Sequence, residues 1–251
     1  MHETTAAKAA VHNIPDAERM KRLPDGGIEE TFIMSAFVGE DWPALLENAT
    51  AVKTMLLASA NPTAHAYAAM RATGMQSIAL LASGRLAEGR AMVEKLPSAC
   101  HQVCDRYRAY YQEVSGDVAG ADRKLGDLAR LLHGPSDYNY WGRLRLRRGD
   151  NEGAAAVFAE GLQYGPWFAD LWQGWGEALL NNGDAAGAIA KFAEAQKTAP
   201  NWARLHLKWG EALARQGKTK EARAKWTAAA GMDLTPSERA ELVEVSRKQT
   251  R

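Results

Sequence analysis

Apolar residues in this chain recur three and four positions apart, which is the spacing of one face of an α-helix. Trp172, Trp175 and Leu179 follow this spacing, and Phe192 continues the apolar pattern after an interruption at Gly183. Glycine or proline breaks the pattern at short intervals in most of the sequence, as expected for short helices joined by turns. The pattern therefore predicts an all-α fold.

The predicted helices pair into hairpins with glycine at the turn. Outside the central stretch, the helices are expected at 28–38, 41–59, 63–82, 86–96, 100–114, 117–132 and 237–248. The turn glycines stand at positions 84, 116, 149, 183 and 217, at intervals of 32, 33, 34 and 34. Glycine suits such a corner because it reaches backbone angles that strain other residues.

The central stretch repeats itself with a period of 34 residues. A shift of 34 superimposes the pairs Trp141-Gly142, Trp175-Gly176 and Trp209-Gly210, and also Ala154, Ala188 and Ala222, and Phe158, Phe192 and Trp226. A period of this length with this composition is typical of a helix-turn-helix solenoid, in which each hairpin buries its apolar face against its neighbours.

These residues resemble the tetratricopeptide repeat (TPR) family. The middle repeat carries all the signature positions, namely Trp172, Trp175, Gly176, Leu179, Ala188, Phe192, Ala195 and Pro200. The neighbouring repeats depart from the family pattern at Arg145, His206 and Leu234. The resemblance implies a right-handed α-solenoid of stacked hairpins with a C-terminal capping helix, in a TPR array of bacterial type.

Four segments are predicted along the chain. They are a polar, loosely ordered arm (1–27), degenerate TPR-like hairpins (28–134), three clear repeats (135–236, divided into 135–168, 169–202 and 203–236) and a C-terminal capping helix (237–251). Small residues such as Gly176, Ala188 and Ala195 are expected where paired helices approach closely. About five hairpins result, or six if 28–59 is counted.

The formal net charge is +1, which provides no global field to concentrate the chain on nucleic acid or anionic lipid. No apolar run approaches the ~20 residues of a membrane span, and residues 1–25 lack the apolar core and cleavage site of a signal peptide. We therefore expect a cytoplasmic protein that binds neither nucleic acid nor membrane.

The chain offers few residues for catalysis or cofactor binding. Cys100 and Cys104 are the only cysteines, too few for a secreted disulfide framework, so reduced thiols are expected. With His101 they have ligand chemistry suited to zinc, but a structural site needs four ligands and His133 is the only other candidate in the neighbouring hairpin, so two partly buried thiols are expected instead. His206 replaces an aromatic residue and is expected to be a packed imidazole. Gly174 and Gly176 lack the third glycine of a dinucleotide-binding loop. We predict no catalytic residue, no metal and no cofactor.

The TPR resemblance also implies which residues line the concave groove. They are Asn139, Arg143 and Arg147 in the first clear repeat, Gln173, Glu177 and Asn181 in the second, and Arg204, Leu207, Glu211 and Arg215 in the third. Arg143 and Arg147 are four apart on one helix face, either as a solvated face or as a patch for an anion or an acidic peptide. The acids Glu177 and Glu211 argue against a clamp for a chaperone's C-terminal carboxylate.

The expected function is non-catalytic protein–protein interaction, in which the groove binds a partner peptide or helix. The alternative is the repeat-bearing C-terminal portion of a larger bacterial regulator or sensor that acts through self-association or intramolecular control. Homo-oligomerisation is compatible with both hypotheses. The sequence does not identify the partner.

Overall fold

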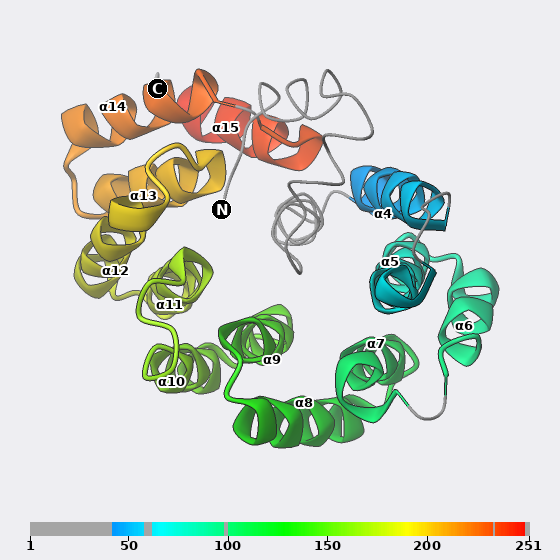
Figure 1. Ribbon diagram of the computed structural model, residues 1–251. Coiled ribbons are helices and arrows are strands. Elements are labelled where there is room, and N and C mark those ends of the chain that lie inside the picture. The colour runs from blue at the N-terminus through cyan, green and yellow to red at the C-terminus, as the bar shows by residue number, and fades with distance from the viewer. Residues whose placement is uncertain (1–41, 58–61, 98–99, 233, 249–251) are drawn as a thin grey trace. The chain divides into compact units, whose positions relative to one another are not determined.

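The computed structural model describes residues 42–57, 62–97, 100–232 and 234–248 (Figure 1). Every regular element in these ranges is a helix, as predicted. The predicted arm (1–27) and the helix at 28–38 lie outside the described residues. Within these ranges the chain divides into two compact units, one up to Leu128 and one from Ala129 onward.

The first unit consists of antiparallel helices in sequence. They are α4 (Trp42–Leu57), α5 (Pro62–Ala82), α6 (Leu86–Glu94), α7 (His101–Val114) and α8 (Val118–Leu132), the last of which continues into the second unit. Helix α5 packs against α4, α6 and α7. Its buried side chains Met75 and Ile78 form part of the core of this unit. The helix positions agree with those expected from the apolar spacing.

The second unit is a row of hairpins followed by a single helix. The hairpins are α9 (Pro135–Arg147) with α10 (Asn151–Gly161), α11 (Ala169–Asn181) with α12 (Ala185–Thr198), and α13 (Ala203–Arg215) with α14 (Thr219–Ala230); α15 (Pro236–Lys248) follows. The first helices α9, α11 and α13 lie along one side of the row and the second helices along the other (Figure 1). The side formed by the first helices carries the ten residues that the sequence predicts in the groove.

A glycine on each first helix sits against an aromatic ring on its partner helix. A Cβ atom at Gly176 would lie 2.4 Å from Cε1 of Phe192, and the same clash would occur between Gly142 and Phe158. The third hairpin repeats the arrangement with Gly210 and Trp226. The repeat therefore requires glycine after each of these tryptophans, because the aromatic ring of the partner helix fills the space that a larger side chain would occupy.

The glycine turns have the backbone conformation that the sequence predicts. All five turn glycines, at positions 84, 116, 149, 183 and 217, have positive φ, between 74° and 96°. A Cβ atom at these positions would meet nothing within 4 Å. Glycine is therefore needed for its backbone freedom and not for space.

Aspartate caps three of the second helices. The side chains of Asp117, Asp150 and Asp184 each accept a hydrogen bond from the backbone N–H three residues on, at 2.8–2.9 Å. Such a cap satisfies one of the N–H groups that a helix start leaves unpaired. At the corresponding place in the third hairpin, Lys218 makes no side-chain cap.

The last helix begins with a capped start. Glu238 N–H donates to Thr235 Oγ1 at 3.2 Å, and Thr235 N–H donates to Glu238 Oε2 at 3.0 Å, which is a reciprocal capping box. Leu242 of α15 then joins a hydrophobic cluster with Leu213 and Trp226. Helix α15 thereby covers the end of the third hairpin.

The prediction of two reduced thiols is wrong, because Cys100 and Cys104 form a disulfide. Their Cα atoms are 5.5 Å apart, one helical turn along the chain, which lies within the range that a disulfide spans. The sequence reasoning counted cysteines and considered their compartment but not this proximity. No group of three or more His, Cys, Asp or Glu in the described ranges is arranged to hold a metal ion.

Candidate functional site: a polar face on the first helices

The ten residues expected in the groove fall into three groups by exposure. Asn139, Arg143, Gln173, Glu177 and Leu207 are buried, Arg204 and Glu211 are half-buried, and Arg147, Asn181 and Arg215 are exposed. All ten come from α9, α11 and α13. Leu207 belongs to the hydrophobic cluster beside α15. Four of the polar members that contact one another form what we call the inner network, namely Arg143, Gln173, Glu177 and Arg204.

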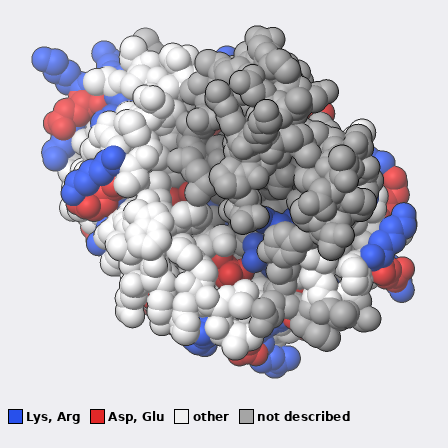
Figure 2. All heavy atoms as spheres, viewed as in Figure 1, with Lys and Arg blue, Asp and Glu red and all other residues white. Residues whose placement is uncertain are grey.

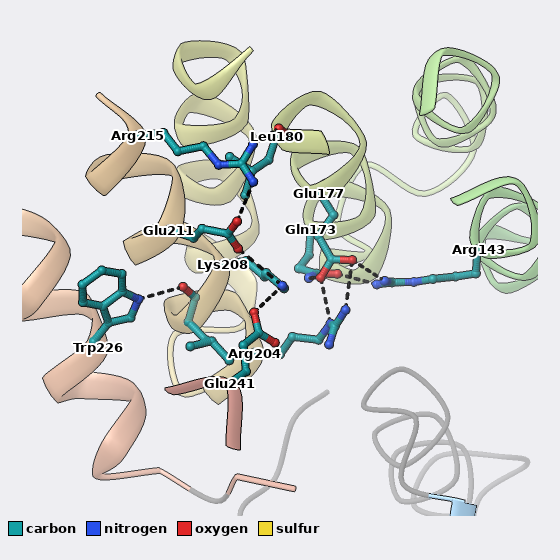
Figure 3. Close-up of polar contacts among 11 residues, drawn as sticks. Arg143, Gln173, Glu177, Leu180, Arg204, Lys208, Glu211, Arg215, Trp226 and Glu241 are labelled. Carbon is teal, nitrogen blue, oxygen red and sulfur yellow. Dashed lines mark hydrogen bonds and ion pairs between the residues drawn. The ribbon is translucent and has the colours of Figure 1, made fainter. Parts of the chain in front are cut away.

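Glu177 on α11 lies at the centre of the inner network (Figure 3). Nη1 of Arg143, from α9, donates to Glu177 Oε2 at 2.9 Å. Nε of Arg204, from α13, lies 2.7 Å from Glu177 Oε1. The side chains of Glu177 and Arg143 are only 8% and 7% exposed, so one carboxylate joins three helices away from solvent.

Gln173 completes the inner network one turn before Glu177. Its amide oxygen accepts a hydrogen bond from Arg143 Nη2, and its amide nitrogen donates to Glu177 Oε1. Asn139, which corresponds to Gln173 in the preceding repeat, is also fully buried. Neither amide atom of Asn139 has a hydrogen-bond partner among the described residues. Gln173 therefore contributes hydrogen bonds to the inner network, whereas the corresponding amide of Asn139 does not.

A second set of ion pairs joins α13 to α15 and α11. Nζ of Lys208 contacts carboxylate oxygens of Glu241 on α15 and of Glu211 one turn along α13. Arg215 donates to Glu211 Oε1 at 2.6 Å through Nη2, and to the Leu180 carbonyl at 2.7 Å through Nη1. Positive and negative groups thus alternate across these helices (Figure 3).

The surrounding cations hold Glu177 in its ionised form. Burial by itself would raise the pKa of this carboxyl, but Arg204, Arg143 and Lys208 outweigh that effect and lower the pKa to about 2. Burial likewise acts to lower the pKa of Lys208, yet Glu177 and the carboxylates of Glu241 and Glu211 raise it overall. These groups are therefore charged at neutral pH.

Sequence reasoning missed Lys208 and Glu241. Lys208 stands four residues after Arg204 on the same helix, so its place on the same face was visible in the spacing. Glu241 had no such signal, because only the packing of α15 brings it within reach of Lys208, which is 33 residues away along the chain.

On the face seen in Figure 2, acidic and basic side chains also occur next to one another.

The tryptophans of the repeat are covered by cations. Lys191 Nζ lies 3.5 Å from the ring centroid of Trp175, and Lys225 Nζ lies 3.3 Å from that of Trp209. These two lysines are themselves 34 residues apart. Each ammonium group can interact with the face of the ring below it, so the repeat preserves a cation–π contact as well as apolar packing.

His206 is the packed imidazole that the sequence predicts. It is 4% exposed, and its Nε2 donates to the Pro200 carbonyl at 2.8 Å. Burial disfavours the charged form of the imidazole and so lowers its pKa.

Among the helices that the structure describes, none is both long and apolar enough to cross a bilayer.

Comparison with known proteins identifies one family in the second unit. The model of the tetratricopeptide repeat family matches residues 141–201, which run from Trp141 through the middle repeat. The matched segment contains α11 and α12, whose residues carry the full signature. No protein with curated annotation shows significant sequence similarity to the chain.

Solved structures provide further comparisons. One structure of MamA is 19% identical and has a TM-score of 0.47, with 68% of this chain and 94% of that chain covered. Another structure of MamA is 17% identical, with a TM-score of 0.49 and coverage of 63% and 95%. YrrB, described as a TPR protein with an unusual peptide-binding site, is 13% identical, with a TM-score of 0.49 and coverage of 70% and 91%.

Proposed function

We propose that this chain, in which residues 141–201 match the tetratricopeptide repeat family, is a non-catalytic interaction protein whose helices α9, α11 and α13 bind a peptide segment of a partner protein. The contact residues in this proposal are the outer row Arg147, Asn181 and Arg215. The inner network holds the helices that present them. The other groove positions expected from the sequence act in support of that row.

The observation that carries this proposal is the outer row itself. Arg147, Asn181 and Arg215 are separated by 34 residues each and are the last residues of α9, α11 and α13. All three are exposed. One polar side chain per hairpin, at equal intervals, suits an extended chain that passes across successive repeats.

The inner network supports binding by fixing the helices beforehand. Glu177 joins α9, α11 and α13 through Arg143 and Arg204. Arg215 of the outer row is itself held by the Leu180 carbonyl and by Glu211. A surface that is already ordered loses less conformational entropy on binding, so more of the contact energy appears as affinity.

The outer row favours a partner segment with acidic side chains. A guanidinium group presents its N–H donors in a plane that matches the two oxygens of a carboxylate. Arg147 and Arg215 flank the neutral amide of Asn181, which can pair with a main-chain amide. The proposed ligand is therefore an extended peptide with acidic residues spaced to reach both arginines.

Selection of random peptides displayed on phage, with the full chain immobilised, tests this function. We expect enrichment of acidic sequences, and synthetic versions should bind the Arg147→Glu, Arg215→Glu double variant at least about tenfold more weakly, since each lost charge-assisted hydrogen bond is worth roughly 1.5–3 kcal/mol. Lys197→Glu on α12 is the matched control, because Lys197 is exposed but lies on a second helix.

Two results would reject the proposal. One is the absence of any enriched peptide. The other is equal weakening by the outer-row variant and by Lys197→Glu, which would indicate a general response to charge. Circular dichroism of both variants confirms that helical content is retained, so that weaker binding reflects the surface and not unfolding.

A further inference from the structure

The disulfide between Cys100 and Cys104 lies at the start of α7, in the unit that ends at Leu128. Cys100 is the N-cap residue of the helix and is half-buried. Cys104, one turn into the helix, is 0% exposed. The two sulfur atoms therefore differ in access, and an incoming reagent reaches Cys100 first.

Contacts other than the disulfide hold this part of the chain in place. Nη2 of Arg108 donates to the Pro97 carbonyl at 2.8 Å, and its Nη1 donates to the Cys100 carbonyl at 3.1 Å. Tyr107 of α7 is fully buried and packs against Gly74 of α5. The start of α7 is thus secured by hydrogen bonds and packing that do not depend on the oxidation state of the cysteines.

A disulfide across so short a loop is also poorly suited to a purely stabilising role. The stabilisation that a cross-link provides by restricting the unfolded chain grows with the length of the loop it closes. Here the sequence separation is 4 residues. The loop is therefore near the short end of the range in which a disulfide stabilises a fold.

We propose that Cys100 and Cys104 form a reversible thiol–disulfide exchange site for low-molecular-weight thiols of the glutathione class. Cys100 is the sulfur that the incoming thiolate attacks, and Cys104 is the resolving thiol. The exchange removes the covalent link across the first turn of α7, while the Arg108 contacts keep the start of the helix in position. This inference does not depend on the proposed peptide binding.

Each step of the exchange balances. An incoming thiolate bonds to Cys100 Sγ, the bond between Cys100 and Cys104 breaks, and the electron pair leaves with Cys104 as a thiolate, which takes up a proton. A second thiolate attacks the sulfur of the bound small thiol, releases Cys100 as a thiolate and yields the small-molecule disulfide. Two thiols are oxidised and the protein disulfide is reduced; the reverse reaction closes it.

The position of Cys100 favours this chemistry. Backbone N–H groups at a helix start carry partial positive charge, which stabilises a thiolate there. A stabilised thiolate at Cys100 is a good leaving group when the second thiol attacks. Cys104 is bonded to the sulfur at position 100 and is fully buried, which shields it from bulky reagents.

Equilibration of the full chain in buffers with graded ratios of reduced to oxidised glutathione is the first test. Free thiols are trapped by alkylation and counted by mass spectrometry. We expect a reversible transition between no free thiol and two, with far-ultraviolet circular dichroism unchanged. A pair that stays oxidised in excess dithiothreitol, or stays reduced in oxidised glutathione, would overturn the proposal, and so would loss of helical structure on reduction.

Single variants assign the roles of the two sulfurs. Cys104→Ser should form a mixed disulfide with oxidised glutathione at Cys100, whereas Cys100→Ser should react at least about tenfold more slowly because Cys104 is buried. Hydrogen exchange of the first turn of α7 should be faster in reduced protein than in oxidised protein. Equal reaction rates in the two variants would contradict the assignment of Cys100 as the attacked sulfur.

Discussion

At the scale of single residues, Glu177 shows how a buried charge is retained in this fold. Removal from water disfavours a carboxylate strongly, and this cost is offset only by well-placed opposite charges. Arg143 and Arg204 approach it from two different helices, and Gln173 adds a neutral hydrogen bond. The inner network therefore depends on Glu177 more than on any one of its partners.

Replacement of Glu177 by Gln should lower the free energy of unfolding by about 3–5 kcal/mol, because two buried guanidinium groups lose their counter-charge. Urea denaturation of the full chain measures this difference. Glu194→Gln is the matched control: Glu194 pairs with Lys197 at the surface, where such pairs contribute roughly 0–1 kcal/mol. Similar losses in the two variants would mean that the inner network does not stabilise the fold.

The stabilisation from Glu177 should also disappear in acid. The pKa of its carboxyl is lowered from 4.5 to about 2 in the folded chain, so the stabilisation is present above pH 4.5 and is lost as the pH falls toward 2. The difference in unfolding free energy between wild type and Glu177→Gln should shrink over that window. Taking the difference removes the contribution of His206, which is common to both proteins. A difference that is constant with pH would contradict this assignment.

At the scale of the helix pair, packing depends on a glycine against an aromatic ring. A Cβ atom at Gly176 would lie 2.4 Å from the ring of Phe192, which is fully buried. Ala usually gains up to about 1 kcal/mol over Gly in a helix. Overpacking costs roughly 1–3 kcal/mol, so steric strain outweighs that gain here.

We expect Gly176→Ala to lower the free energy of unfolding by about 1–2 kcal/mol after both effects are counted. Phe192→Leu should cost less in the Gly176→Ala background than in wild type, because the smaller side chain relieves the clash. Denaturation of the four proteins of this double-mutant cycle measures the coupling. Ala190→Ser, at an exposed position of α12, is the control. Strictly additive effects would show that the glycine and the ring do not oppose each other.

At the scale of the whole molecule, a row of repeats needs a terminal element that covers its last apolar face. Helix α15 does this in the second unit through Leu242, which belongs to the cluster that contains Trp226, and through Val245, which is partly buried and packs against that cluster. The capping box fixes the start of α15, and the contact of Lys208 with Glu241 ties it to α13. A local capping box and a contact between residues distant in sequence thus both hold α15 in place.

A chain that stops at Met232 should unfold at lower denaturant concentration and self-associate, because Leu213 and Trp226 lose their cover. Each large apolar side chain exposed to water costs roughly 1.5–3 kcal/mol. Light scattering over a range of concentrations measures the association. Val243→Ser is the control, since Val243 is 64% exposed on the same helix. A monomeric truncated chain of undiminished stability would show that α15 is dispensable.

Local chemistry explains why so much of the fold was predictable. The turn glycines at 84, 116, 149, 183 and 217 were identified from spacing alone, and each has the positive φ that the prediction requires. The helices from 42 to 57 and from 62 onward were placed within a few residues, because apolar periodicity and breakers act over short distances.

The candidate site was only partly predictable. Periodicity placed Arg143, Glu177 and Arg215 on the first helices, but it did not distinguish a buried network from an exposed row. That distinction depends on which side chains of neighbouring repeats meet, as when Arg143 and Glu177 pair across 34 residues. The disulfide was missed because the redox argument was made from cysteine number, while its formation depends on geometry.

The sequence by itself determined the helices, their turns and the period of the repeat, because each of these depends on residues within one or two turns of each other. Only the tertiary structure decided which charged side chains of the first helices are buried against one another and which are exposed to solvent. The physical reason is that the energy of a charge depends on its burial and on the groups around it. Those surroundings are assembled from helices far apart in the chain.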